Sequence, residues 1–163
     1  MNKYKKCYES LLIGFVHFIP SLVVMSFIFI ASNDSSSGEK SNLITSLIFN
    51  ILSFISPRNL SSFDIDIVNF AIRKIAHISE YFVLMLSNFY FFSNVLKNQK
   101  IRVILLYSFL FTLSYSTLDE FHQSFIPTRV GTYKDVLIDS IGILLAYLTI
   151  FEYKNFKNLN GIY

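Results

Sequence analysis

The sequence has few charged residues for its length. Only 15% of the 163 residues are charged, whereas 53% are hydrophobic, and the mean hydropathy is +0.49. A soluble domain of this size cannot bury so much apolar surface, which excludes an ordinary soluble fold. The composition instead predicts a membrane protein with one domain covering residues 1–163.

Cysteine is almost absent, and the net charge is small. The single cysteine, Cys7, excludes intrachain disulfides and any metal or redox motif built on several cysteines. A net charge of +3 is too small to indicate a nucleic-acid partner. The sequence also lacks a phosphate-binding glycine loop and a nucleophile elbow, which excludes the enzyme chemistries that depend on them.

Long apolar runs are abundant, and they predict an all-α fold. A helix needs about 20 mostly apolar residues to cross a bilayer. We therefore expect an integral membrane protein with four transmembrane helices. The expected spans cover about 11–31, 75–93, 101–118 and 136–151.

The distribution of lysine and arginine predicts the orientation. Eight of these residues lie in the N-terminal segment, in the turn between the second and third spans and in the C-terminal tail, against six in the longer loops opposite. Because cationic loops favour the cytoplasmic side, we expect both termini in the cytoplasm. In the first outer loop we expect a short interfacial or re-entrant helix at 43–56, ending at Pro57, and a second short amphipathic stretch at 63–74.

Ionisable residues gather at the outer ends of three expected spans. In the second span, helical spacing places Lys74, His77 and Tyr81 on one face. Arg73, His77 and Glu80 share an overlapping face at the same end. Charge at this depth is costly in lipid, so these side chains should face other polar groups or a wet pocket.

The third span ends in the run LDEFHQSFIPTRV, which is unusually polar for its surroundings. Asp119, Glu120 and Gln123 share one helical face near the outer interface. Pro127 is expected to end the helix, and Arg129 follows in the turn.

The fourth span begins with carboxylates on one face, where Asp135, Asp139 and Gly142 lie one above another. Thr132 and Asp135 also match a capping box, so Asp135 has a purely structural interpretation. The acidic and basic groups together could equally form an ion-pair network that holds three helix ends in register. The expected ligand-binding residues are Arg73, Lys74, His77, Tyr81, Asp119, Glu120, Gln123, Arg129, Asp135 and Asp139.

Two of these patterns resemble the VanZ family of bacterial membrane proteins. The family's Lys-x-x-His-x-x-x-Tyr element occurs at 74–81. Its Asp-Glu-x-x-Gln-x-x-x-Pro-x-Arg-x-x-x-x-x-Asp element occurs at 119–135 and is followed by Asp139 and Gly142. The similarity extends over about 30–142.

The resemblance implies a protein of the bacterial cytoplasmic membrane with a role in the cell envelope. That role is best known as raised resistance to teicoplanin-type glycopeptide antibiotics. The partners that it implies are membrane lipids and either a lipid-linked cell-wall intermediate or the glycopeptide itself. Nothing in the sequence specifies an oligomeric state.

Two functional hypotheses follow. A binding protein would hold an anionic headgroup, a lipid-linked intermediate or the antibiotic through charge-assisted hydrogen bonds. A membrane-embedded hydrolase or transferase would use His77, Asp119, Glu120 or Asp139 as acid or base, with Arg129 steadying an anionic group. His77, Glu80, Asp119 and Glu120 supply imidazole and carboxylate groups that could in principle bind a metal. Their spacing fits no dedicated metal motif, so we expect neither a metal nor a cofactor.

Overall fold

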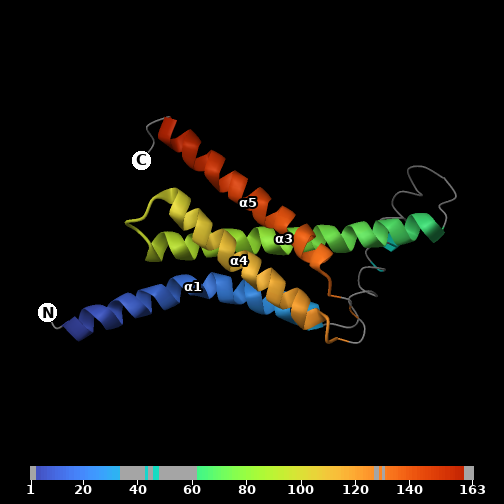
Figure 1. The fold of residues 1–163 in the computed structure, drawn as a ribbon, viewed down its shortest axis with the longest axis horizontal. Coiled ribbons are helices and arrows are strands. Elements are labelled where there is room, and N and C mark those ends of the chain that lie inside the picture. The colour runs from blue at the N-terminus through green and yellow to red at the C-terminus, as the bar shows by residue number, and fades with distance from the viewer. Residues whose placement is uncertain are drawn as a thin grey trace.

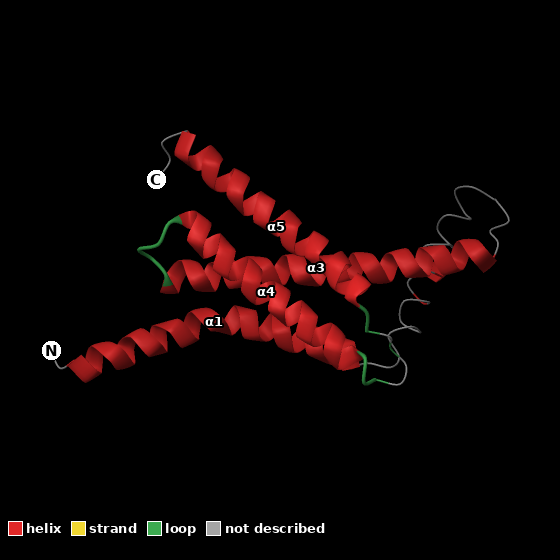
Figure 2. Ribbon diagram, viewed as in Figure 1, coloured by secondary structure: helices red, strands yellow, loops and turns green. Residues whose placement is uncertain are grey.

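The computed structural model describes residues 3–33, 43, 46–47, 62–126, 129 and 131–159. These residues contain helices and no strands, as Figure 2 shows. The long helices are α1 (Lys3–Asn33), α3 (Ser62–Val95), α4 (Ile101–Gln123) and α5 (Tyr133–Leu159). The predicted all-α, four-helix fold class is confirmed for this part of the chain.

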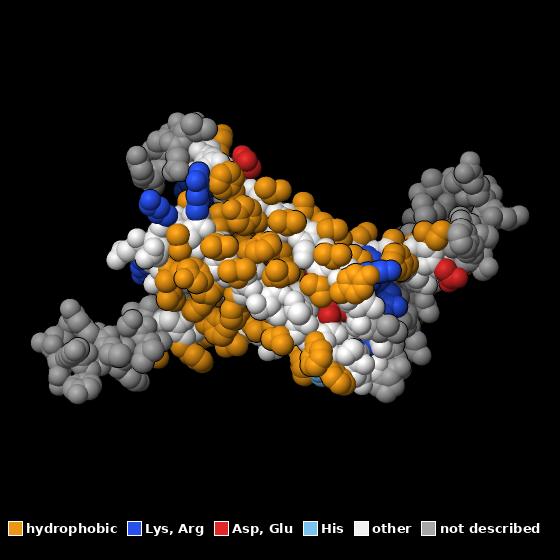
Figure 3. All heavy atoms as spheres, in the orientation of Figure 1, with side chains coloured by type: hydrophobic (Ala, Val, Ile, Leu, Met, Phe, Trp, Pro, Cys, Tyr) orange, Lys and Arg blue, Asp and Glu red, His pale blue; other side chains and the backbone are white. Residues whose placement is uncertain are grey.

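Three helices are long and apolar enough to cross a membrane. The qualifying segments are Gly14–Asn33, Ile101–Gln123 and Tyr133–Lys157. Figure 3 shows hydrophobic side chains over most of the middle of the molecule, with lysine and arginine gathered toward its two ends. An apolar band of this kind is suited to lipid, and the protein is accordingly a membrane protein.

The helix boundaries differ from the expected spans. The stretch 63–74, expected to be separate, is continuous with the second span in α3, since it contains no proline or glycine to interrupt the helix. Helix α5 begins at Tyr133 instead of about 136, and α4 continues past Leu118 to Gln123. The expected interfacial segment 43–56, with Pro57, lies mostly outside the described residues.

The central helix of the bundle is α3, which packs against α1, α4 and α5. The core is mostly aliphatic and comprises Ile28, Tyr81, Leu84, Met85, Leu105, Ile143, Ala146 and Ile150. The α3–α5 contact is especially close at Gly142, where an added Cβ would overlap the carbonyl oxygen of Ile78. Glycine at such a crossing lets two backbones approach, as is common between membrane helices.

The two ends of the bundle differ in what they bring together. Figure 1 places both chain termini and the α3–α4 turn at one end. At the opposite end, α1 and α4 finish and α5 begins. The polar residues singled out in α3, α4 and α5 therefore lie toward one end of the molecule.

Candidate functional site

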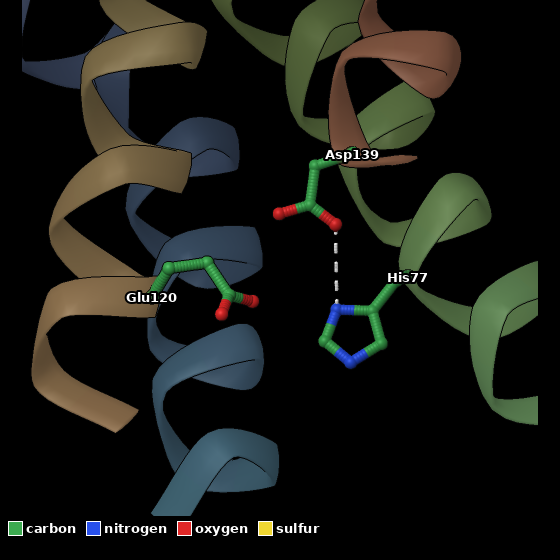
Figure 4. Close-up of side chains that lie close together, drawn as sticks. All are labelled: His77, Glu120 and Asp139. Atoms are coloured by element: carbon green, nitrogen blue, oxygen red, sulfur yellow. Dashed lines mark ion pairs between the residues drawn. The ribbon is translucent and has the colours of Figure 1, made fainter. Parts of the chain in front are cut away.

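Three side chains from three helices converge near that end. His77 on α3, Glu120 on α4 and Asp139 on α5 each offer one ligand atom, and these atoms lie within 4.8 Å of one another. Figure 4 shows the imidazole and the two carboxylates directed into a shared space. Asp139 is fully buried and Glu120 is 4% exposed. Burial makes this a site where electrostatic interactions are strong.

Each carboxylate in this cluster is held through one oxygen. The Ser116 hydroxyl donates to Oδ2 of Asp139 at 2.7 Å, and the Thr132 backbone N–H donates to Oε2 of Glu120 at 3.1 Å. Nδ1 of His77 lies 3.4 Å from Oδ1 of Asp139. Within the described part of the chain, neither of those two buried atoms makes a hydrogen bond. Neighbouring groups therefore fix the orientation of the two carboxylates but leave part of the cluster's hydrogen-bonding capacity unused.

A pocket of about 290 Å³ opens onto the cluster. It is lined by Phe70, Arg73, Lys74, His77, Glu120, Gln123, Arg129 and Asp135. Arg73 is exposed, whereas Glu120 and Gln123 are buried. Cationic groups thus reach the outer part of a pocket whose deep wall carries a carboxylate.

The first turn of α5 is fixed by a cap and an ion pair. The Asp135 N–H donates to the Thr132 hydroxyl at 3.3 Å, and that hydroxyl donates to Oδ2 of Asp135 at 3.0 Å. Lys74 of α3 pairs with the other oxygen of the same carboxylate. The Thr132 hydroxyl thus caps the Asp135 N–H, as one half of the predicted capping box requires, whereas the Thr132 backbone N–H donates to Glu120. Asp135 also lines the pocket, and its ion pair ties α5 to α3.

Asp119 forms a second polar centre, which adjoins the pocket through Gln123. Its Oδ2 accepts hydrogen bonds from Ser32 at 2.9 Å, Tyr81 at 3.1 Å and Gln123 at 2.9 Å. These donors come from α1, α3 and α4, and all of them are buried. Asp119 and Tyr81 do not line the pocket, so their observed contacts hold helices together behind it.

Arg129 connects the α4–α5 loop to the end of α1. Its Nη2 donates to the Ala31 carbonyl oxygen at 2.7 Å, and its side chain also lines the pocket. A cation at the C-terminal turn of a helix is favourably placed for the helix dipole. This contact holds the arginine at the edge of the site.

The structure adds residues that the sequence pattern did not single out. Ser32 contributes to the Asp119 centre, while Ser116 supports Asp139. Phe70 lines the pocket. Serine is common in membrane helices and gives little indication of a site by itself. Ser116, however, lies one turn before Glu120 on the same helical face, and that spacing could have pointed to it.

Comparison with known proteins gives one match. The VanZ/LLP1 family model matches residues 15–155, which include every residue expected to form the site. Searches of curated proteins and of solved structures returned no match. Since the family model covers most of the sequence, the chain belongs to the VanZ/LLP1 family.

Proposed function

We propose that this protein binds a phosphate-bearing headgroup, either of an anionic envelope lipid or of a lipid-linked cell-wall intermediate. The observation that supports this most directly is the pocket, whose lining includes the cationic side chains Arg73, Lys74 and Arg129. Arginine and lysine form strong charge-assisted hydrogen bonds to phosphate oxygens. Lys74 also pairs with Asp135, so an incoming anion would compete with that carboxylate for the Lys74 ammonium group.

The size of the pocket favours a headgroup over a whole antibiotic. Its volume of about 290 Å³ is at the lower limit of sites that hold drug-sized molecules, about 300–1,000 Å³. A glycopeptide antibiotic is too large to enter such a space, whereas a phosphate group fits with its lipid tail left in the bilayer. Raised tolerance to teicoplanin-type antibiotics would then follow indirectly, through an altered envelope lipid or wall intermediate.

The proposed location is the bacterial cytoplasmic membrane, with the pocket on its outer side. The termini and the α3–α4 turn share one end of the bundle, and that end carries Lys97, Lys100, Arg102 and Lys154. A concentration of positive charge in short loops favours the cytoplasmic side. The pocket lies toward the opposite end, where outer-leaflet headgroups would be accessible.

Headgroup binding is tested with a soluble short-chain lipid. The purified protein in neutral detergent is titrated with short-chain phosphatidylglycerol, with phosphatidylcholine of the same chain length as the uncharged comparison. We expect saturable binding of the anionic lipid, weakened at least about tenfold by Arg73→Ala, because a hydrogen bond to a charged group contributes about 1.5–3 kcal/mol.

Arg102→Ala is the matched control, since Arg102 is also an exposed arginine but lies on α4 next to the α3–α4 turn. Equal binding of the two lipids, or equal effects of the two substitutions, would count against the proposal. Inorganic phosphate as a competitor separates recognition of the phosphate from recognition of the lipid.

An enzymatic function is the second candidate, and the convergence of His77, Glu120 and Asp139 favours it. Two carboxylates and an imidazole whose polar atoms lie within 4.8 Å of one another can act as general acid and base toward a bound substrate. The substrate class would be a lipid-linked or phosphorylated envelope molecule. Identical lipid extracts from a sensitive Gram-positive host expressing the wild type or Glu120→Gln would argue against catalysis.

Antibiotic tolerance is measured in the same host. We expect the wild type to raise the teicoplanin concentration that inhibits growth and Glu120→Gln to remove the increase at equal membrane abundance. No increase with the wild type would separate this protein from the family's best-known activity.

A further inference from the structure

We infer that His77, Glu120 and Asp139 bind one divalent metal ion of the zinc or manganese type at the base of the pocket. The first argument is convergence: three side chains from α3, α4 and α5 place ligand atoms within 4.8 Å of one another. Helices hold such ligands more rigidly than loops do. One imidazole nitrogen and two carboxylate oxygens form a donor set that both metals accept.

The second argument is the unsatisfied bonding of the cluster. Asp139 is fully buried, yet its Oδ1 accepts no hydrogen bond from the described residues. Nδ1 of His77 also makes no hydrogen bond, and the two atoms face each other as an ion pair at 3.4 Å, longer than a good hydrogen bond. Buried polar atoms are normally hydrogen-bonded, and a bound ion is one recognised reason for an exception.

The third argument is the support around the ligands. Ser116 donates to one oxygen of Asp139, and the Thr132 N–H donates to one oxygen of Glu120. In each case the other oxygen remains available to a cation. Hydrogen bonds from neighbouring groups to ligating carboxylates are typical of protein metal sites, where they fix the orientation of the ligand.

The charge balance also favours a cation. Two buried carboxylates approach each other here, with Asp119 and Glu80 close by on the same helices. Lys74 is paired with Asp135, whose carboxylate it neutralises. A divalent ion would offset the negative charge of the two buried carboxylates, since buried charge is costly unless it is compensated.

The geometry requires only a small closure. Metal–ligand distances of about 2.0–2.2 Å put the ligand atoms of a tetrahedral site about 3.4 Å apart. A contraction of about 1.4 Å from a separation of 4.8 Å is within the range of side-chain rotation. His77 and Glu120 both line the pocket, so the remaining coordination position would face it.

The open coordination position would give the headgroup of the proposed function a further contact. This step of the inference rests on the proposed function. A phosphate oxygen of the bound headgroup would occupy the open coordination position, while the cationic side chains contact the other oxygens. The metal would thus offset the carboxylates that otherwise repel an anion from the base of the pocket.

The test is metal binding by the full-length protein without added lipid. Protein in neutral detergent is stripped with a chelator and titrated with Zn²⁺ and Mn²⁺, with Mg²⁺ for comparison, and the bound metal is counted by elemental analysis. We expect one zinc or manganese ion per chain and much weaker binding of magnesium, which rarely uses imidazole. Affinity should fall on acidification, because the ligands bind metal in their deprotonated forms.

Three variants probe the ligands and their support. His77→Gln and Asp139→Asn should each reduce zinc affinity by more than about 100-fold, and Ser116→Ala by about 10-fold, as for an outer-shell partner. His122→Gln is the control, since His122 contacts Asn33 and Phe29 instead of the cluster. Circular dichroism and gel filtration establish that each variant keeps its helices and its size.

Two results would overturn the inference: no zinc or manganese binding by the wild type up to millimolar concentration, or unchanged affinity in folded His77→Gln and Asp139→Asn. If a ligand variant does not fold, the absorption spectrum of Co²⁺-loaded wild type tests the ligands instead. A nitrogen–oxygen site gives a Co²⁺ spectrum without the intense charge-transfer band of a thiolate site. Detergent without protein is the blank. Metal binding without headgroup binding would overturn the proposed function and leave the metal site standing.

Discussion

Asp119 and Glu120 are neighbours on α4, but their carboxylates have different surroundings. Three buried side chains donate to Oδ2 of Asp119, which lies behind the pocket. Glu120 lines the pocket and accepts one hydrogen bond from the Thr132 backbone. The other oxygen of Asp119, Oδ1, is buried and makes no hydrogen bond with the described residues. The two residues therefore differ in their position: Asp119 links three helices away from the pocket lining, whereas Glu120 lines the pocket, where a ligand can reach it.

This difference predicts unequal effects on stability. Asp119→Ala leaves the hydroxyls of Ser32 and Tyr81 and the amide of Gln123 without their shared acceptor. A buried donor without an acceptor costs about 1–3 kcal/mol, so we expect a large fall in the thermal midpoint. Glu120→Ala leaves one backbone N–H unpaired and should cost less. Thermal unfolding in detergent, followed by circular dichroism, gives both midpoints, and a larger fall for Glu120→Ala would contradict the assignment.

The contact between α3 and α5 determines the geometry of the cluster. Gly142 is one turn after Asp139 on α5, and Ile78 directly follows His77 on α3. An added Cβ at Gly142 would overlap the Ile78 carbonyl and lie 3.1 Å from the Phe82 nitrogen. Backbone atoms cannot rotate away, so any larger side chain must push the two helices apart.

We therefore expect Gly142→Ala to destabilise the protein by about 1–3 kcal/mol, the usual cost of overpacking, although alanine favours helix formation. It should also weaken metal binding, because Asp139 would move away from His77. Gly14→Ala is the matched control, since a Cβ there would meet only the Val95 side chain at 4.0 Å. A Gly142→Ala protein as stable as the Gly14→Ala protein would show that the close crossing is not needed.

Helical periodicity explains how much of this arrangement could be predicted from the sequence. A spacing of three or four residues places Lys74, His77 and Tyr81 on one face, and the structure directs those side chains toward α4 and α5. Periodicity cannot show how closely two helices approach. The overlap at Gly142 and the convergence on Asp139 depend on the crossing of α3 and α5, which brings together residues 62 positions apart.

Hydrogen-bond partners were harder to predict than faces. Asp119 and Glu120 are adjacent in one motif, and only the rotation of α4 decides which of them lines the pocket. Ser32 contributes through a contact with Asp119, 87 positions away in the chain, and Thr132 through a backbone N–H, which side-chain patterns do not reveal. The expected absence of a metal motif rested on linear spacing, whereas the proposed ligands come from three helices and leave no linear signature.

The two ends of the molecule carry different features. Both termini and the α3–α4 turn lie at one end, and the pocket lies toward the other. If all four helices cross the bilayer, the two ends face different compartments. The headgroup proposal requires the pocket end to face the outside, so the orientation of the chain is a direct test of it.

Cysteine labelling in intact cells measures that orientation. In a Cys7→Ser background, Asn98→Cys marks the α3–α4 turn and Lys134→Cys marks the first turn of α5, and both positions are exposed. We expect a membrane-impermeant maleimide to label position 134 in intact cells and position 98 only after permeabilisation, because positive charge favours the cytoplasm. The reverse pattern would place the pocket among inner-leaflet headgroups. Labelling of both positions in intact cells would mean that α4 does not cross the bilayer, contrary to its length and apolarity.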